Sequence, residues 1–437
     1  MLQARDILGM NARNHLFQSR YNRKSGKIIA NSKLLTKSTL KKEKIPVPKL
    51  YRVFRKDEDV ERYNFTKLPD SFVVKPNKGL GGEGILVIDR GGVFAGEWVL
   101  TDGRTVSISD LQLHLNDILS GKYSLYDLPD FAFVEERIPV HKSFSKISFQ
   151  GTPDVGILIF NRVPVMAFLR LPTQESGGKA NMFQGAIACG IDIATGITVH
   201  AVKHTHSVRF FPGSRRKLVG VKVPDWDEVL DVALDTSRAV GLGYCRVDLA
   251  IHPKRGPVVL EINAQPGLKI QLSNMRPLRR RLLRVEGLRV KSRRQGVEIG
   301  KALFADSRVH LPYAKEGPRI GTFEEVQIAS LLGDKIPIKA KIDTGAFRTS
   351  IDEDLAGRLG LLETGNQLLT MEFRSSLGKE ERKLVNLTFY LKGKKIKTIA
   401  SVADRSGLKR PMIIGRRDLR PFTFRVRKWE AHEEVKH

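Results

Sequence analysis

Four polar residues on two neighbouring predicted strands form the set with the clearest chemical potential. Arg246 and Asp248 lie two positions apart on the first strand. Glu261 and Asn263 lie two positions apart on the next, beyond a turn. Side chains at this spacing point to one face of a strand, so three oxygen ligands and an arginine could converge. Hard cations such as Mg²⁺ take such oxygens. The simpler alternative is an Arg246–Asp248 ion pair with Glu261 in solvent.

A second candidate is the glycine-rich stretch "SFVVKPNKGLGGEGILVI" at residues 71–88. Lys75 ends the first of its two apolar strands. Glycines allow backbone amides to approach phosphate oxygens closely, and a lysine adds a point charge. Because the loop joins strand to strand, it is neither a P-loop nor a dinucleotide-binding turn. Phosphate binding and a plain turn are both open. The glycines are Gly79, Gly81, Gly82 and Gly84.

A third candidate is the strand "FAFVEERIPV" at residues 131–140, which runs into paired acids and reads as a linker between two lobes. Glu135, Glu136 and the neighbouring backbone could hydrogen-bond an adenine amino group and ring nitrogen. Taken alone, the stretch fits a strand that ends in solvated acids equally well.

The composition bounds the kind of protein that carries these residues. With 437 residues, a formal net charge of +28 and a pI near 10.1, we expect several domains and an affinity for polyanions. The cysteines Cys189 and Cys245 are too few for a disulfide framework or a thiolate zinc site. No apolar run approaches the roughly 20 residues that cross a bilayer, and residues 1–56 lack a secretory signal's apolar core. We expect a soluble cytoplasmic protein.

The chain divides into unequal parts that must position the candidates. We predict a basic N-terminal segment at residues 1–30 and a body at residues 31–275. A basic linker follows at residues 276–318, and a small all-β unit at residues 319–430. Within the body, strands alternate with helices predicted at residues 33–44, 109–120 and 226–240, the first capped by Asn31-Ser32. The fold class is therefore α+β, with an all-β domain behind it.

The order of the motifs from residue 30 to residue 270 resembles the ATP-grasp superfamily. Its parts are a Lys-containing helix that ends in Ile-Pro-x-Pro, the lysine and glycine hairpin, the Glu-Glu strand, Arg-x-Asp, and Glu-x-Asn before Pro-Gly. The resemblance implies that Asp248, Glu261 and Asn263 hold Mg²⁺ ions bridging ATP phosphates. It also implies that Arg246 stabilises an acyl-phosphate or the tetrahedral intermediate formed from it. ATP and Mg²⁺ are thus the expected cofactors.

Residues 154–196 resemble the matching segment of peptide-forming ATP-grasp enzymes, particularly the ribosomal-protein glutamate ligases. The match implies that Arg170, Lys179 and Asn181 bind phosphates or the acidic substrate, although a solvated loop is the alternative for each. The opening "LGMNARN" is closer to members associated with sugar transfer. A Rossmann-like lobe usually precedes the motifs, and here about thirty basic residues stand there, so we expect the acceptor site to be built differently or borrowed from a partner.

Three histidines in "HAVKHTHS" could suggest zinc, since His204 and His206 share a strand face. Without a third-ligand pattern nearby, we favour for them and for His200 a contact with substrate phosphate or a place lining the cleft.

The C-terminal unit resembles the retropepsin-like aspartic peptidase fold. "IPIKAKIDTGAFRTSID" places Asp-Thr-Gly after an alternating strand, and "RPMIIGRRDL" supplies a late Ile-Ile-Gly. The match is closest to the small family named ATP-dependent zinc proteases. Aspartic peptidases need two carboxylates sharing a proton. This unit offers Asp343, so peptidase activity requires a homodimer with Asp343 facing its copy. Alternatively the domain binds an acidic peptide near Lys339, Lys341 and Arg348.

The basic stretch at residues 276–296 has two readings. Its arginines could contact nucleic acid or anionic membrane, or it forms a basic helix packed on the body. The arginines are Arg279, Arg280, Arg281, Arg284, Arg289, Arg293 and Arg294.

Together these features predict a carboxylate-amine ligase that adds an amino acid, glutamate first, to a protein or peptide acceptor and carries a domain that trims or binds the product. The alternatives are an ATP-binding scaffold whose tail captures an acidic partner, and an envelope-associated ligase acting on a sugar-linked carboxylate.

Overall fold

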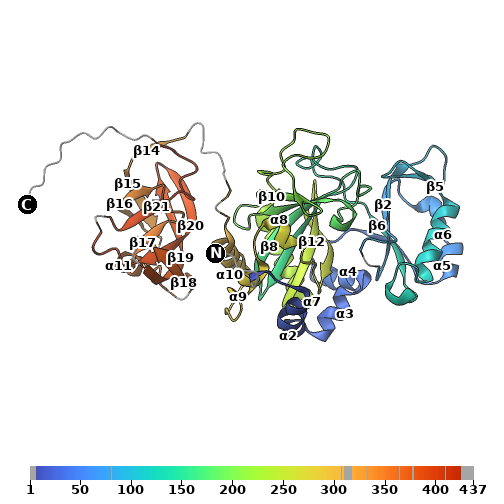
Figure 1. Cartoon of the computed structure of the whole chain (residues 1–437), viewed down its shortest axis with the longest axis horizontal. Helices are drawn as coiled ribbons and strands as arrows, with labels where there is room; N and C mark the ends of the chain where they lie inside the picture. Colours follow the sequence, from blue (N-terminus) through green and yellow to red (C-terminus); the bar gives the residue numbers. More distant parts are fainter. Residues whose placement is uncertain are drawn as a thin grey trace, which may run out of the picture. The chain divides into compact units, whose positions relative to one another are not determined.

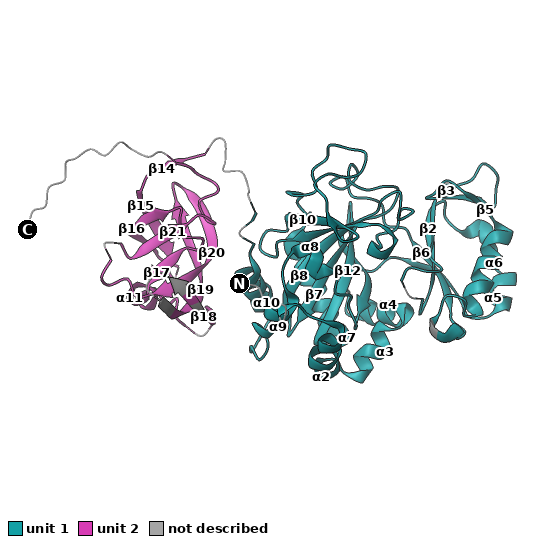
Figure 2. Cartoon of the chain, viewed as in Figure 1, with its two compact units in different colours: residues 1–309 teal, residues 310–437 magenta. Residues whose placement is uncertain are grey.

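The computed structural model describes residues 6–79, 81–306, 308–309, 317–331, 333–363, 365–375, 378–408 and 410–424. The chain forms two compact units, Met1–Val309 and His310–His437 (Figures 1 and 2). The first is a mixed α/β body and the second is mainly β. No helix within the described ranges is long and apolar enough to cross a membrane.

The first unit begins with an antiparallel six-stranded sheet in the order β1-β6-β2-β3-β4-β5. Helix α6 is fixed by a capping box between Ser107 and Asp110. Its buried residues, among them Leu111, Leu115 and Ile118, recur at helical spacing and pack into the core of this sheet. The elements are β1 (Leu50–Phe54), α5 (Asp57–Glu61), η3 (Phe65–Lys67), β2 (Phe72–Pro76), β3 (Leu86–Gly91), β4 (Glu97–Leu100), β5 (Thr105–Ser107), α6 (Ile108–Leu119), η4 (Leu125–Asp127) and β6 (Ala132–Glu136).

A second sheet of seven antiparallel strands follows in the order β11-β10-β9-β8-β7-β12-β13. Strands β7 and β8 are almost wholly buried, as their continuous apolar runs indicate. The elements are β7 (Asp154–Phe160), β8 (Val163–Leu171), η5 (Met182–Gln184), β9 (Ile187–Ile191), β10 (Thr198–Lys203), β11 (His206–Ser207), α7 (Trp226–Val240), β12 (Tyr244–His252), β13 (Gly256–Asn263) and α8 (Ile270–Asn274). The predicted helices 109–120 and 226–240 are confirmed within one residue.

Helix α8 lies directly against strand β9. A Cβ added at Gly190 would come within 2.3 Å of the carbonyl oxygen of Ser273 and 2.7 Å of the Cα of Asn274. Asn274 also donates from Nδ2 to the carbonyl of Ala167 at 2.9 Å. Helix α8 therefore rests on the sheet face to which Gly190 belongs, and only glycine leaves room for its backbone.

The N-terminal segment is part of the first unit. Phe17 is buried edge-on against Phe160, with ring centroids 5.3 Å apart. Asn22 accepts from the Tyr244 amide at 2.8 Å and donates to the carbonyls of Tyr244 and Ala264 at 2.7 and 3.1 Å. It thereby ties the segment to the ends of β12 and β13. The elements are α1 (Met10–Ala12), η2 (Arg13–Gln18), α2 (Ser19–Tyr21), α3 (Lys24–Ala30) and α4 (Lys33–Lys42).

The stretch predicted as a basic linker contains two helices, α9 (Leu278–Leu283) and α10 (Arg293–Phe304), which contact β8. Arg281 donates to the carbonyl of Val165 at 2.9 Å and lies 5.0 Å from the ring of Phe304. Burial lowers the pKa of Arg281 to about 10. Of the two readings of this stretch, the structure favours the basic helix packed on the body.

In the second unit, six strands close into a barrel. Strand β15 pairs with β16 on one side and β19 on the other, so the ring runs β15-β16-β21-β17-β20-β19, and β18 extends from β19. The predicted all-β unit is confirmed except for one short helix. The elements are β14 (Arg319–Ile320), β15 (Phe323–Ala329), β16 (Lys335–Asp343), β17 (Ser350–Asp352), α11 (Glu353–Arg358), β18 (Gln367–Ser375), β19 (Gly378–Leu391), β20 (Lys394–Ala403), β21 (Met412–Gly415) and β22 (Thr423–Phe424).

The close approach at Gly190 predicts a stability effect. In Gly190→Ala the new methyl group meets the backbone of α8, which cannot turn aside as a side chain can. We expect the free energy of unfolding to fall by roughly 1–3 kcal/mol, the usual cost of overpacking, in chemical denaturation. The control is Gly267→Ala, since a Cβ there has nothing within 4 Å. Equal stability of the two variants would show that α8 is free to move off the sheet.

Candidate functional site

A cluster of lysines surrounds one buried carboxylate of the first sheet. Glu135 on β6 is paired with Lys75 of β2 at 2.7 Å and with Lys37 of α4 at 2.5 Å. Lys33, at the start of α4, donates to the carbonyl of Gly79 at 3.0 Å. Burial lowers the pKa of Lys33 and Lys37. Burial opposes ionisation of Glu135, but Lys75 and Lys37 outweigh it and lower its pKa.

Helix α4 begins beside the glycine loop for a local reason. Ser32 caps the helix, accepting from the Leu35 amide at 3.2 Å, and donates to Asn77 Oδ1 at 2.9 Å. The backbone carbonyl of Asn77 in turn accepts from the Lys33 amide at 3.2 Å. The predicted cap is confirmed, and it places the start of α4, with Lys33, beside the loop.

The glycine loop is held from two directions. Asn181 donates from Nδ2 to the carbonyl of Gly81 at 2.6 Å, and the His114 ring lies 2.9 Å from the carbonyl of Gly84. Burial lowers the pKa of His114, and the charges of Lys122 and Lys179 add to that effect. Gly81, Gly82 and Gly84 adopt positive φ values of 62°, 81° and 68°, which few other residues tolerate.

The second predicted acid of the β6 motif is engaged differently. Glu136 accepts from Arg255 in the β12–β13 turn at 2.5 Å and from the backbone amide of Lys49 at 3.0 Å. The structure thus gives both Glu135 and Glu136 cationic partners.

The Arg-x-Asp and Glu-x-Asn motifs meet on the second sheet. Asp248 lies opposite Glu261, and Arg246 lies opposite Asn263. Arg246 donates from Nε and Nη2 to Asp248 at 2.6 and 2.7 Å. Asn263 donates from Nδ2 to Asp248 at 3.1 Å and to Glu261 at 3.0 Å. The convergence and the Arg246–Asp248 ion pair, posed as alternatives from the sequence, both occur.

A second arginine–aspartate pair adjoins the first. Arg170, near the end of β8, donates from Nε and Nη2 to Asp154 at 2.6 Å each, and its Nη2 lies 3.1 Å from Asp248. Burial raises the pKa of Asp154 to about 6, with Arg170 acting against the rise. Burial also opposes ionisation of Asp248, but Arg246 and Arg170 outweigh it and lower its pKa to about 2.

The two clusters act on a common group. Glu261 of the second sheet and Glu135 of the first both raise the pKa of Lys33, although burial outweighs them. Helix α4, which carries Lys33, contacts β13, the strand of Glu261, and Lys33 bonds to Gly79 of the glycine loop, so the loop and the acidic strands border one region.

The donor set fits a hard cation. Asp248 and Glu261 supply carboxylate oxygens, and rotation of the Asn263 amide would present Oδ1 in place of Nδ2. Two carboxylates and an amide match the ligands that Mg²⁺ takes when phosphates supply the rest.

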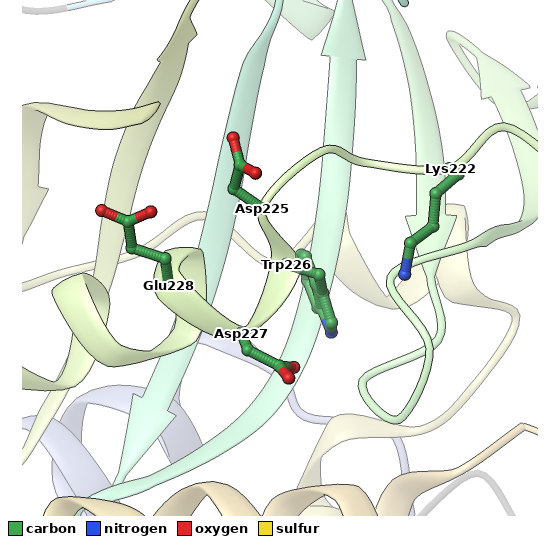
Figure 3. Close-up of a pocket in the computed structure, with 5 residues that line it drawn as sticks. All are labelled: Lys222, Asp225, Trp226, Asp227 and Glu228. Atoms are coloured by element: carbon green, nitrogen blue, oxygen red, sulfur yellow. The ribbon is translucent and has the colours of Figure 1, made fainter. Parts of the chain in front are cut away.

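The histidines and a hollow at the start of α7 lie outside this set. Within the described residues no group of three His, Cys, Asp or Glu could hold a metal ion. His200 contacts Ser207 Oγ at 2.9 Å, and His204 contacts Glu175 at 2.7 Å. A hollow of about 310 Å³ at the start of α7 contains none of the predicted site residues. Figure 3 shows its lining residues Lys222, Asp225, Trp226, Asp227 and Glu228.

In the second unit, Asp343 ends β16 opposite Gly415 of β21. Its Oδ1 accepts from the amides of Gly345 at 2.9 Å and Ala346 at 3.1 Å. The Gly415 amide donates to Thr349 Oγ1 at 3.2 Å, and Thr349 donates to the buried Asp418. The Asp-Thr-Gly loop and the Ile-Ile-Gly strand are therefore neighbours.

Three residues of the site were not among the sequence candidates: Lys33, Lys37 and Asp154. The helix of the first two had been recognised, but nothing indicated which of its lysines face inward. A signal for Asp154 existed, because it opens the strand whose hairpin partner ends near Arg170.

Residues 12–287, well over half of the chain, match the family described as sugar-transfer-associated ATP-grasp. No curated protein matches the chain.

Three solved structures resemble parts of the chain. The ATP-grasp ligase PsnB, complexed with a minimal precursor, is 16% identical with a TM-score of 0.32 over 60% of this chain and 62% of that one, less than two thirds of its length. The D-alanine–D-alanine ligase of Bacillus anthracis, complexed with ATP, is 15% identical with a TM-score of 0.34 over 64% and 75%. The simian foamy virus protease is 18% identical with a TM-score of 0.17 over 22% and 90%. At these values none of them assigns an activity, whereas the family match is direct: this chain belongs to the sugar-transfer-associated ATP-grasp family.

Proposed function

We propose that the chain is an ATP- and Mg²⁺-dependent ligase that joins a carboxylate to an amine through an acyl-phosphate. The observation that carries the proposal is the meeting of Asp248, Glu261 and Asn263, with Asn263 Nδ2 3.1 Å from one carboxylate and 3.0 Å from the other. These three residues would hold Mg²⁺, which neutralises phosphate charge when bound. The structures of similar ligases, solved with ATP or with Mg and ADP, agree with these cofactors.

The lysine cluster is suited to the nucleotide phosphates. Lys33 and Lys75 lie beside a loop in which Gly81 and Gly82 are open to close backbone approach, whereas Pro76 and Tyr123 occupy the space beside Gly79 and Gly84. Glu135 pairs with both Lys37 and Lys75, and its carboxylate thereby holds Lys75 in position. Lys179 and Asn181 would complete the cover of this loop, since Asn181 is bonded to Gly81.

The proposed reaction has two steps. A substrate carboxylate oxygen attacks the terminal phosphorus of ATP, forming an acyl-phosphate and releasing ADP. An amine then attacks the acyl carbon, phosphate leaves with the C–O bond electrons, and the amine loses a proton. Arg246 would stabilise the negative charge that develops on the acyl oxygen, and the protein otherwise acts by positioning.

For the substrates we propose glutamate, or a similar amino acid, and a protein or peptide acceptor. PsnB, similar in part, is solved with a minimal precursor. The second candidate substrate is a sugar-linked carboxylate, in line with the family's description as associated with sugar transfer. The third candidate function is a scaffold that binds ATP without turnover. Unlike a ligase, such a scaffold would release no ADP when amino acid and acceptor are added.

We also propose that the C-terminal barrel is retropepsin-like and active as a homodimer. In favour stands the pairing of Asp343 with Gly415 on neighbouring parallel strands of a closed barrel. The sequence contains one Asp-Thr-Gly motif. A dimer of two chains would therefore supply the two carboxylates that share a proton.

Loss of the Glu261 charge should abolish ligation. In Glu261→Gln the side chain keeps its size but offers the cation a neutral amide. We expect the rate of product formation to fall about 100-fold or more, as when a preorganised electrostatic contact is removed. The measurement is the mass increment of candidate acceptors incubated with ATP, Mg²⁺ and each amino acid.

The matched control is Glu58→Gln, an exposed acid on α5 of the same unit, which should ligate at the wild-type rate. An unchanged mass increment in Glu261→Gln would remove that residue from the site.

Trimming, where it occurs, should depend on Asp343. Asparagine cannot share a proton with a second carboxylate, so Asp343→Asn should lose cleavage of the ligated product and keep ligation. The product mass is followed over time, with Asp404→Asn, which removes an exposed carboxylate of the same unit, as control. Continued cleavage by Asp343→Asn would refute the peptidase assignment.

A further inference from the structure

Four charges alternate in a row on the second sheet: Asp154, Arg170, Asp248 and Arg246. The two carboxylates are buried, and the two guanidinium groups are partly buried. Successive members are 2.6, 3.1 and 2.6 Å apart. Both guanidinium groups lie near the ring of Phe168, with their carbons 5.4 and 5.6 Å from its centroid.

A glycine in β7 makes room for this row. A Cβ added at Gly156 would come within 2.0 Å of the Phe168 ring and 3.0 Å of Asp248 Oδ1. The ring and the carboxylate therefore occupy the space that the side chain of any other residue at this position would fill.

The two arginines of the row are not equivalent. Arg170 has a carboxylate of its own, since Asp154 accepts two hydrogen bonds from it at 2.6 Å while Asp248 lies at 3.1 Å. In the described part of the chain, the ion pair of Arg246 is made with Asp248.

A cation at Asp248 would act on the two arginines differently. Both oxygens of Asp248 accept hydrogen bonds from Arg246, and one also from Asn263, so a cation competes with these donors. Asp248 is 0% exposed, which keeps water from replacing a lost partner. Arg170 would stay neutralised by Asp154, whereas Arg246 would need another anion.

We propose that Asp154 is a positioning residue that anchors Arg170 when Asp248 takes up a divalent cation, leaving Arg246 as the arginine that turns from Asp248 to the substrate. This inference rests on the proposed function and assigns separate tasks to the two arginines. Without Asp154, Arg170 would turn to Asp248 as its remaining carboxylate and compete with the cation.

The test measures Mg²⁺-dependent binding of ADP, by fluorescence of a labelled ADP titrated with Mg²⁺, and needs no turnover. Asp154→Asn preserves the shape of the side chain and removes its charge. We expect the Mg²⁺ concentration for half-maximal binding to rise about 10-fold or more, the range seen when a partner of a metal ligand is lost. Binding of the labelled ADP in EDTA should not change.

The double variant Asp154→Asn/Arg170→Gln separates anchoring from general damage. Removal of the competing guanidinium should return the Mg²⁺ requirement toward the wild-type value, a coupling that a merely structural role of Asp154 would not produce. Asp306→Asn is the matched control, because Asp306 is a buried carboxylate that also holds two arginines, Arg308 at 2.7 Å and Arg276 at 3.3 Å. It should leave the Mg²⁺ requirement unchanged.

Three results would overturn the inference: a wild-type Mg²⁺ requirement in Asp154→Asn, an equal shift in Asp306→Asn, or no recovery in the double variant. The proposed function fails separately. If Asp154→Asn shifts the Mg²⁺ requirement and no acceptor gains mass, the anchoring role stands without the ligase. If wild-type ADP binding ignores Mg²⁺, both are overturned.

Discussion

The buried carboxylate of Asp248 is the constraint on which the rest of the first unit depends. A charge with no exposure costs several kcal/mol unless partners compensate it. The partners are two guanidinium groups and an amide, and they come from different strands: Arg170 from β8, Arg246 from β12 itself and Asn263 from β13. Strand β7 lies between β8 and β12 and supplies the acid that balances Arg170. Neutralising this one side chain thus depends on the order and register of four neighbouring strands.

Two β-bulges explain how much of the site the sequence could predict. The period of two correctly placed Arg246 with Asp248, and Glu261 with Asn263. Whether the two pairs lie on the same face of the sheet depends on the register of β12 and β13. The turn sets His252 opposite Gly256. Regular pairing from there would set Val247, not Asp248, opposite Glu261. A shift between Asp248 and Leu249 corrects this by one residue. The β7–β8 hairpin is similar, since regular counting from Phe160 and Val163 sets Leu169 opposite Asp154, and a shift between Leu158 and Ile159 brings Arg170 there. A bulge has no reliable sequence signal, so counting brings Asp154 close to Arg170 but one residue short of being its partner.

Local signals elsewhere predicted elements well and long-range partners poorly. Ser32 predicted the start of α4, and the spacing of apolar residues predicted α6 and α7. Helix caps and amphipathic faces can be predicted because they depend on residues that are close together in the sequence. The partner of Glu136 is Arg255, 119 residues further along, and nothing in either neighbourhood points to the other. The same applies to Lys37 and Glu135. In the second unit, alternation predicted the strands, but closure of the barrel depends on the pairing of β15 with β19, which lie far apart in the chain. Pairing across such distances is decided by the packing of the whole unit.

The distribution of charge, more than its total, connects the fold with the proposed chemistry. A net charge of +28 favours any polyanion and selects none. The first-sheet cluster has three ammonium groups for one carboxylate: Lys33, Lys37 and Lys75 with Glu135. The second-sheet cluster has three carboxylates for two guanidinium groups: Asp154, Asp248 and Glu261 with Arg170 and Arg246. One side of the region is thus positive and the other is acidic, while Lys33 feels both. A phosphate chain would be neutralised by the first cluster, and the acids of the second would hold a divalent cation that comes with it. A bare polyanion would be attracted by the first cluster and repelled by the second.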